Sequence, residues 1–283
     1  MDFERLFDGA NLPAPLDTAS RYAMANGGKR VRPLLVCASY LSVCDGLVDD
    51  MLRRAMMAVE LLHGYSLVHD DLPCMDDDEL RRGKPTCHVV YGEDVALLAG
   101  DVLQSLAFEV LTADIAGFEQ VKEMTAFGLL QVFVPRARRM VSGQMLDVVG
   151  EAQTLSQSEL ESIHVDKTGA LIEASVLMGA VCAGASKEQL AQLIQFAKCL
   201  GLAYQVQDDV LDVVSDTATL GKPAGSDDKL QKSTYVKLLG VDGAATYADE
   251  LYTQAIRHAK NLQIGTTPSL LIELVLWLQQ RQK

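Results

Sequence analysis

Apolar residues recur at helical spacing along most of this chain, and strand-like alternation is scarce. The clearest stretch predicts a helix from about Val48 to Asp71, and the charged segment Asp76–Pro85 then predicts a loop. Two further helices are expected at about Glu93–Leu111 and Glu119–Val149, with Pro135 as a kink in the second. The first half of the chain is therefore predicted to be helical.

The second half continues in the same way and carries recognisable helix starts. Ser156 or Ser158 can cap the helix that carries Lys167 and Thr168, because a serine oxygen accepts a hydrogen bond from a free backbone N–H. Ser186 followed by Gln189 has the form of a capping box at the start of a longer helix. The segment 219–233 is rich in glycine, lysine and aspartate and predicts a surface loop, with two or three helices after it.

Composition narrows the class of protein. The 283 residues are 49% hydrophobic, which is enough for a sizeable core, and no linker or repeat divides them. One all-α domain over residues 1–283 is predicted, with no membrane span and no signal peptide. Six scattered cysteines without a CxxC pair favour a reduced, cytoplasmic protein without zinc. The net charge of −13 argues against a nucleic-acid-binding surface.

Two acidic clusters stand out, at residues 70–79 and 207–212. Asp208 and Asp212 are four residues apart, so they share one face of a helix. Carboxylates in apolar helices are costly unless they are paired or bind metal, and oxygen ligands suit Mg²⁺. Either cluster alone could be a solvated, capping or loop motif, but two such clusters in apolar surroundings favour metal binding.

Short basic patches accompany these acidic clusters. Lys29, Arg30 and Arg32 follow the Gly27-Gly28 pair, and Arg81-Arg82 follows the first acidic cluster. Arginine binds phosphate through paired hydrogen bonds, and glycine lets the backbone approach closely. Any one of these residues could form a surface salt bridge, yet their grouping in an acidic protein favours an anionic substrate. His63 lies seven residues before Asp70, and packing or function are equally open for it.

These motifs, in this order, resemble the trans-isoprenyl diphosphate synthases, and most closely the bacterial-type farnesyl diphosphate synthases. The resemblance covers roughly residues 20–240 and rests on Gly27–Pro33, Asp70–Gly83, Lys167–Ala170 and Gln205–Asp212. It implies an all-α antiparallel bundle around a deep central cavity. It also implies Mg²⁺-dependent condensation of isopentenyl diphosphate with dimethylallyl and geranyl diphosphate in a cytoplasmic homodimer.

The resemblance also implies a role for each matching residue. It implies three Mg²⁺ ions, or Mn²⁺ in their place, held by Asp70, Asp71, Asp76, Asp208, Asp209 and Asp212. It implies isopentenyl diphosphate binding by Gly28, Lys29, Arg32, His63 and Arg82, and allylic diphosphate binding by Arg81, Lys167, Lys222 and Lys232. Lys167, Thr168 and Gln205 would flank the reacting carbons, and Asp70 and Asp208 count with them as catalytic.

Product length depends on the residues four and five positions before the first aspartate, which in this family form the floor of the chain pocket. Here they are Ser66 and Tyr65. Five residues along a helix span about 7.5 Å, comparable to one or two isoprene units, so the Tyr65 ring can stop elongation early. The fifteen-carbon product, farnesyl diphosphate, is therefore predicted, although Tyr65 could also be a packing residue.

Other functions remain as alternatives. A geranylgeranyl diphosphate synthase shares nearly every motif and differs mainly in pocket depth. A terpene cyclase needs no second diphosphate site. Degraded aspartate motifs would favour a silent regulatory subunit, but both motifs are intact, and a structural Mg²⁺ protein leaves the basic residues without a role. The arginines within Arg136–Arg139 match nothing in the family pattern and are interpreted as surface charge.

Overall fold

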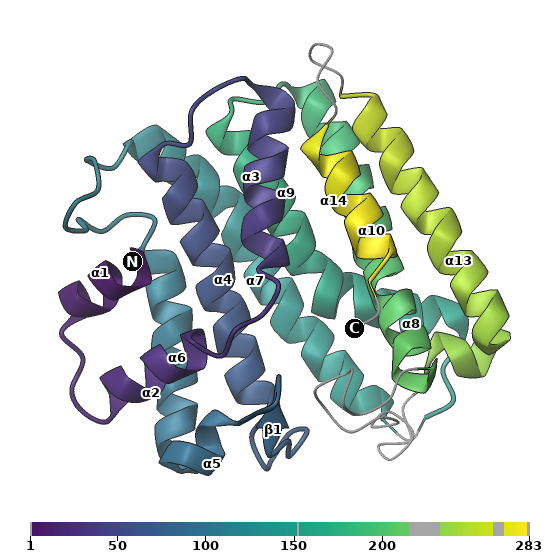
Figure 1. The fold of residues 1–283 in the computed structure, drawn as a ribbon, viewed down its shortest axis with the longest axis horizontal. Helices are drawn as coiled ribbons and strands as arrows, with labels where there is room; N and C mark the ends of the chain where they lie inside the picture. The colour runs from purple at the N-terminus through teal and green to yellow at the C-terminus, as the bar shows by residue number, and fades with distance from the viewer. Residues whose placement is uncertain (1, 152, 215–232, 263–268, 282–283) are drawn as a thin grey trace. The chain divides into compact units, whose positions relative to one another are not determined.

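A computed structural model describes residues 2–151, 153–214, 233–262 and 269–281, which are mostly helical (Figure 1). The contacts divide the chain into two compact units. The first unit comprises Met1–Leu34 and Val48–Leu130, and the second comprises Leu35–Leu47 and Gln131–Lys283. Helices α3 (Val31–Val43) and α7 (Glu123–Gly150) contribute residues to both units. The single domain over residues 1–283 stays a prediction.

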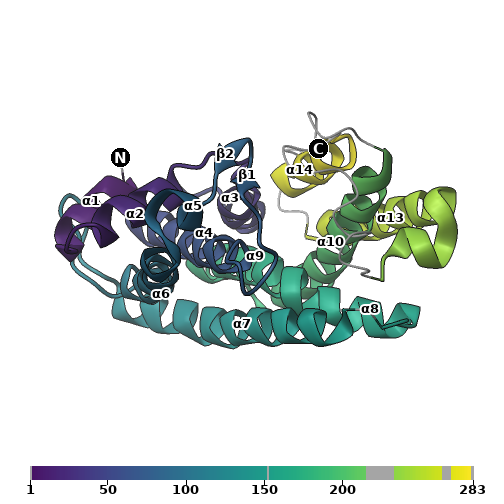
Figure 2. The ribbon, with the colours of Figure 1, turned by 90° about the horizontal axis from the view of Figure 1, so that it is seen from below.

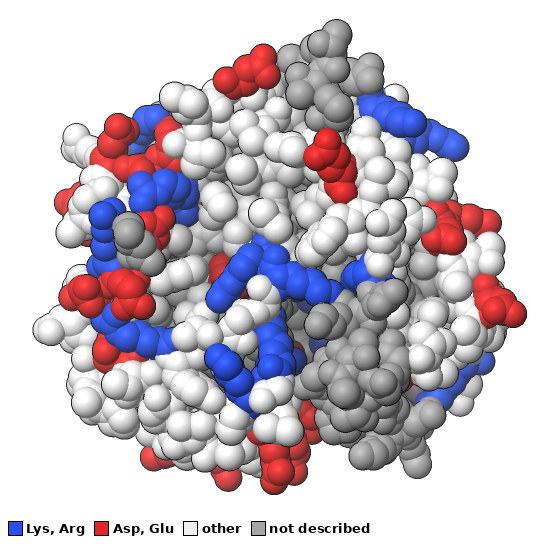
Figure 3. Space-filling model, viewed as in Figure 1, with Lys and Arg blue, Asp and Glu red and all other residues white. Residues whose placement is uncertain are grey.

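The first unit is built around α4 and α6, which lie side by side in both views (Figures 1 and 2). Its elements are α1 (Asp2–Ala10), α2 (Leu16–Met24), α4 (Asp50–Asp70), β1 (Leu80–Arg81), β2 (Lys84–Pro85), α5 (Cys87–Tyr91) and α6 (Glu93–Glu109). The predicted helix at Val48–Asp71 is confirmed, and Asp49 caps it by accepting from the Leu52 N–H at 2.9 Å. Acidic and basic side chains are intermixed over the N-terminal helices (Figure 3), where Arg21 pairs with Asp8 and Asp17.

The charged segment 76–85 is not only a loop, as predicted, but contains a short antiparallel hairpin. Leu80 pairs with Pro85, and Arg81 pairs with Lys84. Arg82 (φ 55°) and Gly83 (φ 75°) form its two-residue turn. Left-handed backbone at both central positions suits the twist of a tight hairpin, and glycine adopts it without strain. The hairpin fixes the direction in which Arg81 and Arg82 leave the backbone.

The second unit is built around α9 and α10. Its elements are α8 (Gln157–His164), the π-helical turn η1 (Val165–Gly169), α9 (Ala170–Cys182), α10 (Lys187–Val214), α13 (Tyr235–Lys260) and α14 (Leu270–Gln279). Helix α13 lies along α10 in both views (Figures 1 and 2). The predicted cap is Ser156, which accepts from the Glu159 N–H in a full capping box, and the predicted capping box at Ser186 is present, with Ser186 accepting from the Gln189 N–H.

Helix α9 is the centre of the second unit's core, because its residues from Ala170 to Ala180 are all buried. Buried side chains all around a helix indicate that other elements cover every face. Gly179 allows one of these contacts, since a side chain there would meet the Val36 carbonyl oxygen at 2.1 Å. Among the residues that the structure describes, no helix is long and apolar enough to cross a membrane.

Arg54 is the largest fully buried side chain and connects α4 to the chain after α6. Its guanidinium donates to the carbonyl oxygens of Val110 at 2.9 Å, Ala113 at 2.7 Å and Glu119 at 3.3 Å. Carbonyls at the end of a helix have no partner within the helix, so they need donors from elsewhere. Arg54 supplies those donors and fixes the end of α6 against α4.

We predict that Arg54→Met lowers the free energy of unfolding by about 3 kcal/mol, because methionine fills the space but leaves buried carbonyls without donors. Urea denaturation followed by circular dichroism measures this loss. The matched control is Arg53→Met, which removes the half-exposed pairs with Asp2 and Asp50 and should cost about 1 kcal/mol or less. Equal losses in the two variants would contradict the role given to Arg54.

Candidate active site

The first acidic cluster lies where α4 ends. Asp70 is the last residue of α4, and Asp71 is its C-cap. The chain then turns back, so that the Asp76 N–H donates to the Asp70 carbonyl at 2.9 Å. This turn places the predicted metal ligands Asp70, Asp71 and Asp76 on one short stretch of folded-back backbone. They lie at the negative end of a helix dipole, where carboxylates are unfavourable unless a cation accompanies them.

Arg81 is the cation nearest to Asp71. It reaches back from the hairpin and pairs with Asp71 at 2.5 Å and with Asp78 at 3.5 Å. Burial raises the pKa of Asp71 to about 7, although Arg81 opposes that rise. The predicted metal ligand Asp71 and the predicted diphosphate ligand Arg81 are therefore direct neighbours.

Arg82 belongs to the second predicted anion site, the one for isopentenyl diphosphate. Its Nη1 donates to the Gly27 carbonyl at 2.6 Å. A side chain at Gly28, whose φ is 108°, would lie 2.3 Å from the same nitrogen. Gly28 is therefore required twice, for its left-handed backbone and for the space that Arg82 occupies. Arg30, which follows this turn, pairs with the buried Glu60 and donates to the Met24 carbonyl at 2.8 Å.

His63 lies among these basic residues. Burial lowers its pKa well below the usual value of 6.5, and the nearby positive charges lower it further. The arginines responsible are Arg32, Arg82, Arg81 and Arg30. Guanidinium groups around a neutral histidine can bind an anion. His63, Arg32 and Arg82, which were predicted to bind one diphosphate, lie close together. Lys29 is half-buried in the same unit, next to Arg30 in sequence.

The two predicted floor residues lie on α4 one turn before the acidic cluster. The ring of Tyr65 meets the ring of His69 edge-on, with centroids 4.8 Å apart. His69 in turn contacts the Leu97 carbonyl of α6 at 2.9 Å, and Gly100 leaves room for it. Ser66 turns its hydroxyl back to the His63 carbonyl at 2.9 Å. Tyr65 is thus held in place by α6 through His69.

In the second unit, Lys167 and Thr168 lie on η1. Lys167 Nζ is 2.6 Å from Asp147 Oδ2 on α7. Gly143 of α7 lets η1 approach, since a side chain there would meet the Lys167 backbone nitrogen at 2.1 Å. The sequence predicted an ordinary helix at this position. A π turn inside helical structure is uncommon and is frequent at functional sites.

A chain of hydrogen bonds connects Thr168 to the second acidic cluster. Thr168 Oγ1 donates to Gln205 Oε1 at 3.1 Å, and Gln205 Nε2 donates to Asp209 Oδ1 at 3.2 Å. The other Asp209 oxygen accepts from the Tyr235 N–H at 2.8 Å. The buried Asp209 therefore fixes the orientation of the Gln205 amide, and the Gln205 carbonyl oxygen faces Thr168.

Asp208 has a cationic partner that the sequence did not indicate. Arg281 Nη1 lies 2.6 Å from Asp208 Oδ1, and its guanidinium stacks on the Tyr204 ring at 3.7 Å. The Arg281 side chain is only 4% exposed, whereas that of Asp208 is 40% exposed. Asp212, the third aspartate of this cluster, is buried. Arg281 stands near the C-terminus, outside every motif used to predict the site.

Arg136 and Arg139 correct one sequence interpretation. They are not free surface charge, because both pair with the buried Glu173 of α9, at 2.6 Å and 2.8 Å. The only signal in the sequence was Glu173 itself, an acidic residue in an otherwise apolar stretch. Arg138, between them, is exposed, as the surface interpretation expected.

The donor set fits Mg²⁺ in its chemistry, because every predicted ligand is a carboxylate oxygen, which this hard cation prefers. Within the described part of the chain, no three acidic, histidine or cysteine side chains form a complete metal site. Mg²⁺ commonly uses one or two carboxylates together with substrate phosphates and waters. The predicted ligands Lys222 and Lys232 lie outside the described residues.

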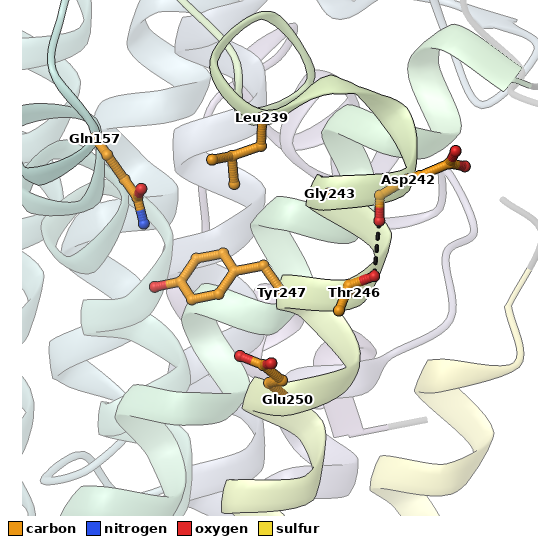
Figure 4. A pocket seen from close by; sticks show the side chains of 7 residues that line it. All are labelled: Gln157, Leu239, Asp242, Gly243, Thr246, Tyr247 and Glu250. Atoms are coloured by element: carbon orange, nitrogen blue, oxygen red, sulfur yellow. Dashed lines mark hydrogen bonds between the residues drawn. The ribbon is translucent and has the colours of Figure 1, made fainter.

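A separate pocket of about 450 Å³ opens between α8 and α13 (Figure 4). It contains none of the predicted site residues and is lined by Gln157, Leu239, Asp242, Gly243, Thr246, Tyr247 and Glu250. Thr246 Oγ1 donates to the Asp242 carbonyl at 2.8 Å within α13. The Tyr247 hydroxyl donates to Glu161 at 2.8 Å. The chemistry predicted from the motifs does not use this pocket.

Comparisons with known proteins agree with the motifs. A family model described as Polyprenyl synthetase matches residues 13–266. The chain is 45% identical over 267 residues to farnesyl diphosphate synthase of Haemophilus influenzae, covering 93% of this chain and 88% of that protein. It is 44% identical over 246 residues to the chloroplastic geranylgeranyl pyrophosphate synthase of Catharanthus roseus, covering 86% of this chain and 68% of that protein.

A solved structure gives the same result. The geranyltransferase of Helicobacter pylori, complexed with magnesium and isoprenyl diphosphate, matches with a TM-score of 0.80 and 33% identity. The match covers 98% of this chain and 93% of that one. The resemblance inferred from the motifs and the all-helical fold class are confirmed.

We predict that His63 makes the folded chain less stable as the pH falls below 6.5, its usual pKa. In that range the unfolded chain protonates His63 while the folded chain keeps it neutral, so protons favour unfolding. At higher pH neither state is protonated, and the effect disappears. Urea denaturation at about pH 7.5 and about pH 5.5 should show a smaller loss for His63→Gln than for the wild type. A His63 ring signal that titrates at or above 6.5 in NMR spectra would contradict this prediction.

Proposed function

Because the chain belongs to the polyprenyl synthetase family, we propose that it joins isopentenyl diphosphate to dimethylallyl and geranyl diphosphate. The main product is farnesyl diphosphate. The reaction ionises the allylic diphosphate, condenses the cation with isopentenyl diphosphate, and removes a proton. The proposal extends to one domain over residues 1–283.

The observation that carries this proposal is the pairing of two anion-binding chemistries in the first unit. Asp70, Asp71 and Asp76 supply carboxylates, and carboxylates bind a diphosphate only through a cation. Arginines surround His63, and arginine binds a diphosphate directly. A condensing enzyme needs two diphosphate sites of this kind, whereas a terpene cyclase has one diphosphate substrate.

We infer that Mg²⁺ binds Asp70, Asp71 and Asp76 in the first unit and Asp208 in the second, with Asp209 and Asp212 supporting. When bound, it neutralises the diphosphate as the carbon–oxygen bond breaks. Three ions per site, and Mn²⁺ as a substitute, are part of the proposal. The magnesium bound in the Helicobacter pylori structure supports magnesium as the metal.

The arginines bind the two diphosphates. Arg81, beside Asp71, contacts the allylic diphosphate and stabilises the negative charge that develops on it. Arg82, Lys29, Arg32 and the Gly28 backbone hold isopentenyl diphosphate. Neutral His63 donates a hydrogen bond to that diphosphate without adding a charge. Lys222 and Lys232 are proposed to contact the allylic diphosphate.

Around the reacting carbons, the protein supplies dipoles instead of a nucleophile. The Gln205 carbonyl and the Thr168 hydroxyl turn their oxygen lone pairs toward the allylic cation, and Lys167 flanks it. The isopentenyl alkene forms the new carbon–carbon bond, and the diphosphate leaves with the electron pair of the broken bond. The departed diphosphate then accepts the proton lost from the adjacent carbon. Apolar walls exclude water, which would otherwise trap the cation.

Product length is argued from Tyr65. Its ring lies one turn before Asp70 and is held by His69, so it can stop the growing chain. The alternative is a geranylgeranyl diphosphate synthase, which the 44% identity to the Catharanthus roseus protein favours. The two relatives are almost equally similar in sequence, so we base the proposal of the shorter product on the local contacts of Tyr65.

We also propose a cytoplasmic homodimer. All six cysteines are free, which suits a reducing compartment. Helix α7 exposes apolar residues at helical spacing along one face in the second unit, namely Val134, Val141, Met145 and Val148. A second copy of the chain can cover such a face.

The purified chain should make farnesyl diphosphate from isopentenyl and geranyl diphosphate when Mg²⁺ is present, and EDTA should abolish the reaction. Asp208→Ala should lower kcat by about 10²-fold or more, because it removes a carboxylate that anchors the cation. Asp242→Ala, an exposed acidic residue of α13, is the control and should keep wild-type activity. Chromatography of the products measures both. A folded wild-type chain without condensation would favour the silent-subunit alternative.

Replacing Tyr65 by alanine should shift the products from fifteen to twenty or more carbons, because the ring no longer blocks the pocket. Mass spectrometry of the dephosphorylated products reads the chain lengths directly. Tyr91→Ala removes an aromatic ring from α5 of the same unit and should leave product length unchanged. If Tyr65→Ala still makes only the fifteen-carbon product, Tyr65 is a packing residue and not the floor.

A further inference from the structure

Arg136 and Arg139 lie almost one turn apart on α7 and share one acceptor, the buried Glu173 of α9. Arg136 Nη2 is 2.6 Å from Glu173 Oε1, and Arg139 Nη1 is 2.8 Å from Glu173 Oε2. Burial alone would raise the pKa of Glu173, but the hydrogen bonds from Arg139 and Arg136 outweigh it and lower that pKa. Glu173 is therefore a charged group held between two guanidinium groups.

Arg139 makes contacts that Arg136 does not. Its Nε donates to Asp166 Oδ1 at 2.7 Å, and its Nη2 donates to the Val165 carbonyl at 3.3 Å. Both acceptors belong to η1, the turn that carries Lys167 and Thr168. A guanidinium group is a rigid fork, so three bonds from one group fix η1 relative to α7 and α9. The remaining Arg136 bond goes to the Val132 carbonyl of its own helix.

The rest of η1 is also tightly packed. Gly143 of α7 lies against the Lys167 backbone. Gly201 of α10 lies against Gly169, since a side chain added at Gly201 would meet the Gly169 Cα at 2.9 Å. The middle of η1 therefore lies against α7 and its end lies against α10, whereas the Arg139 side chain binds the Asp166 carboxylate and the Val165 carbonyl at its beginning. A displacement of that beginning would move Lys167 and Thr168, which follow directly.

We propose that Arg139 is a positioning residue that fixes η1 and thereby holds Lys167 and Thr168 in their reactive orientation. Arg136 stabilises Glu173 without touching η1. This inference rests on the proposed function for its catalytic consequence, but the anchoring of η1 can be measured without activity. The motifs gave Arg139 no role, and its contacts distinguish it from its neighbour Arg136.

The test compares Arg139→Gln with Arg136→Gln, which each remove one charge and one partner of Glu173. Hydrogen exchange measured by mass spectrometry should show faster exchange of the peptide over Val165–Gly169 only in Arg139→Gln. Arg139→Gln should also lower kcat on the order of 10- to 100-fold, as expected for a displacement of about 1 Å, with little change in the KM for isopentenyl diphosphate. Arg136→Gln should keep wild-type kcat.

Two further variants keep the test decisive. Asp166→Asn weakens the η1 contact but retains the Arg139–Glu173 pair, so it should reproduce the local exchange even if Arg139→Gln folds poorly. Arg139→Lys keeps the charge without the fork and should restore kcat only in part. Equal exchange and equal kcat in Arg139→Gln and Arg136→Gln would overturn the proposal. If the wild type makes no prenyl product, the proposed function fails, and the exchange comparison alone decides whether Arg139 anchors η1.

Discussion

Charge buried in a helical protein needs a partner, and backbone inside a helix cannot supply it because its own groups are already paired, whereas helix ends and other side chains can. The partner must come from a different element. Arg54 of α4 reaches carbonyls after α6, Glu173 of α9 reaches α7, and Asp209 of α10 reaches the start of α13. Each buried charge therefore holds two elements together. If either partner is lost, the desolvation of the other is no longer compensated.

The candidate catalytic groups obey the same constraint. Asp71 is paired with Arg81, and Asp208 is paired with Arg281. Burial still raises the pKa of Asp71 to about 7, so one arginine does not fully compensate for its surroundings. A second cation beside Asp71 would relieve that cost. The need for a cationic partner therefore governs these carboxylates as it governs the buried charges in the cores of the two units.

The sequence predicted those features that depend on neighbours along the chain. The α4 helix, the serine cap of α8, the capping box at Ser186, and the grouping of Asp70 with Asp76 all follow from local spacing. Contacts between distant segments were not predictable. Nothing in the sequence indicates that Arg139 meets Glu173, thirty-four residues away, or that Arg281 meets Asp208. The π turn was also missed, because it arises from close packing against Gly143 and Gly201.

Product length shows why overall similarity cannot replace local contacts. Two relatives with different products are 45% and 44% identical to this chain, so identity does not separate them. The position of the Tyr65 ring depends on His69, which depends on the Leu97 carbonyl and on the space at Gly100. A side chain at Gly100 would displace His69, against which the Tyr65 ring packs, without altering any motif residue. In the proposed assignment, chain length therefore depends on a contact between α4 and α6, which lies outside the family's motifs.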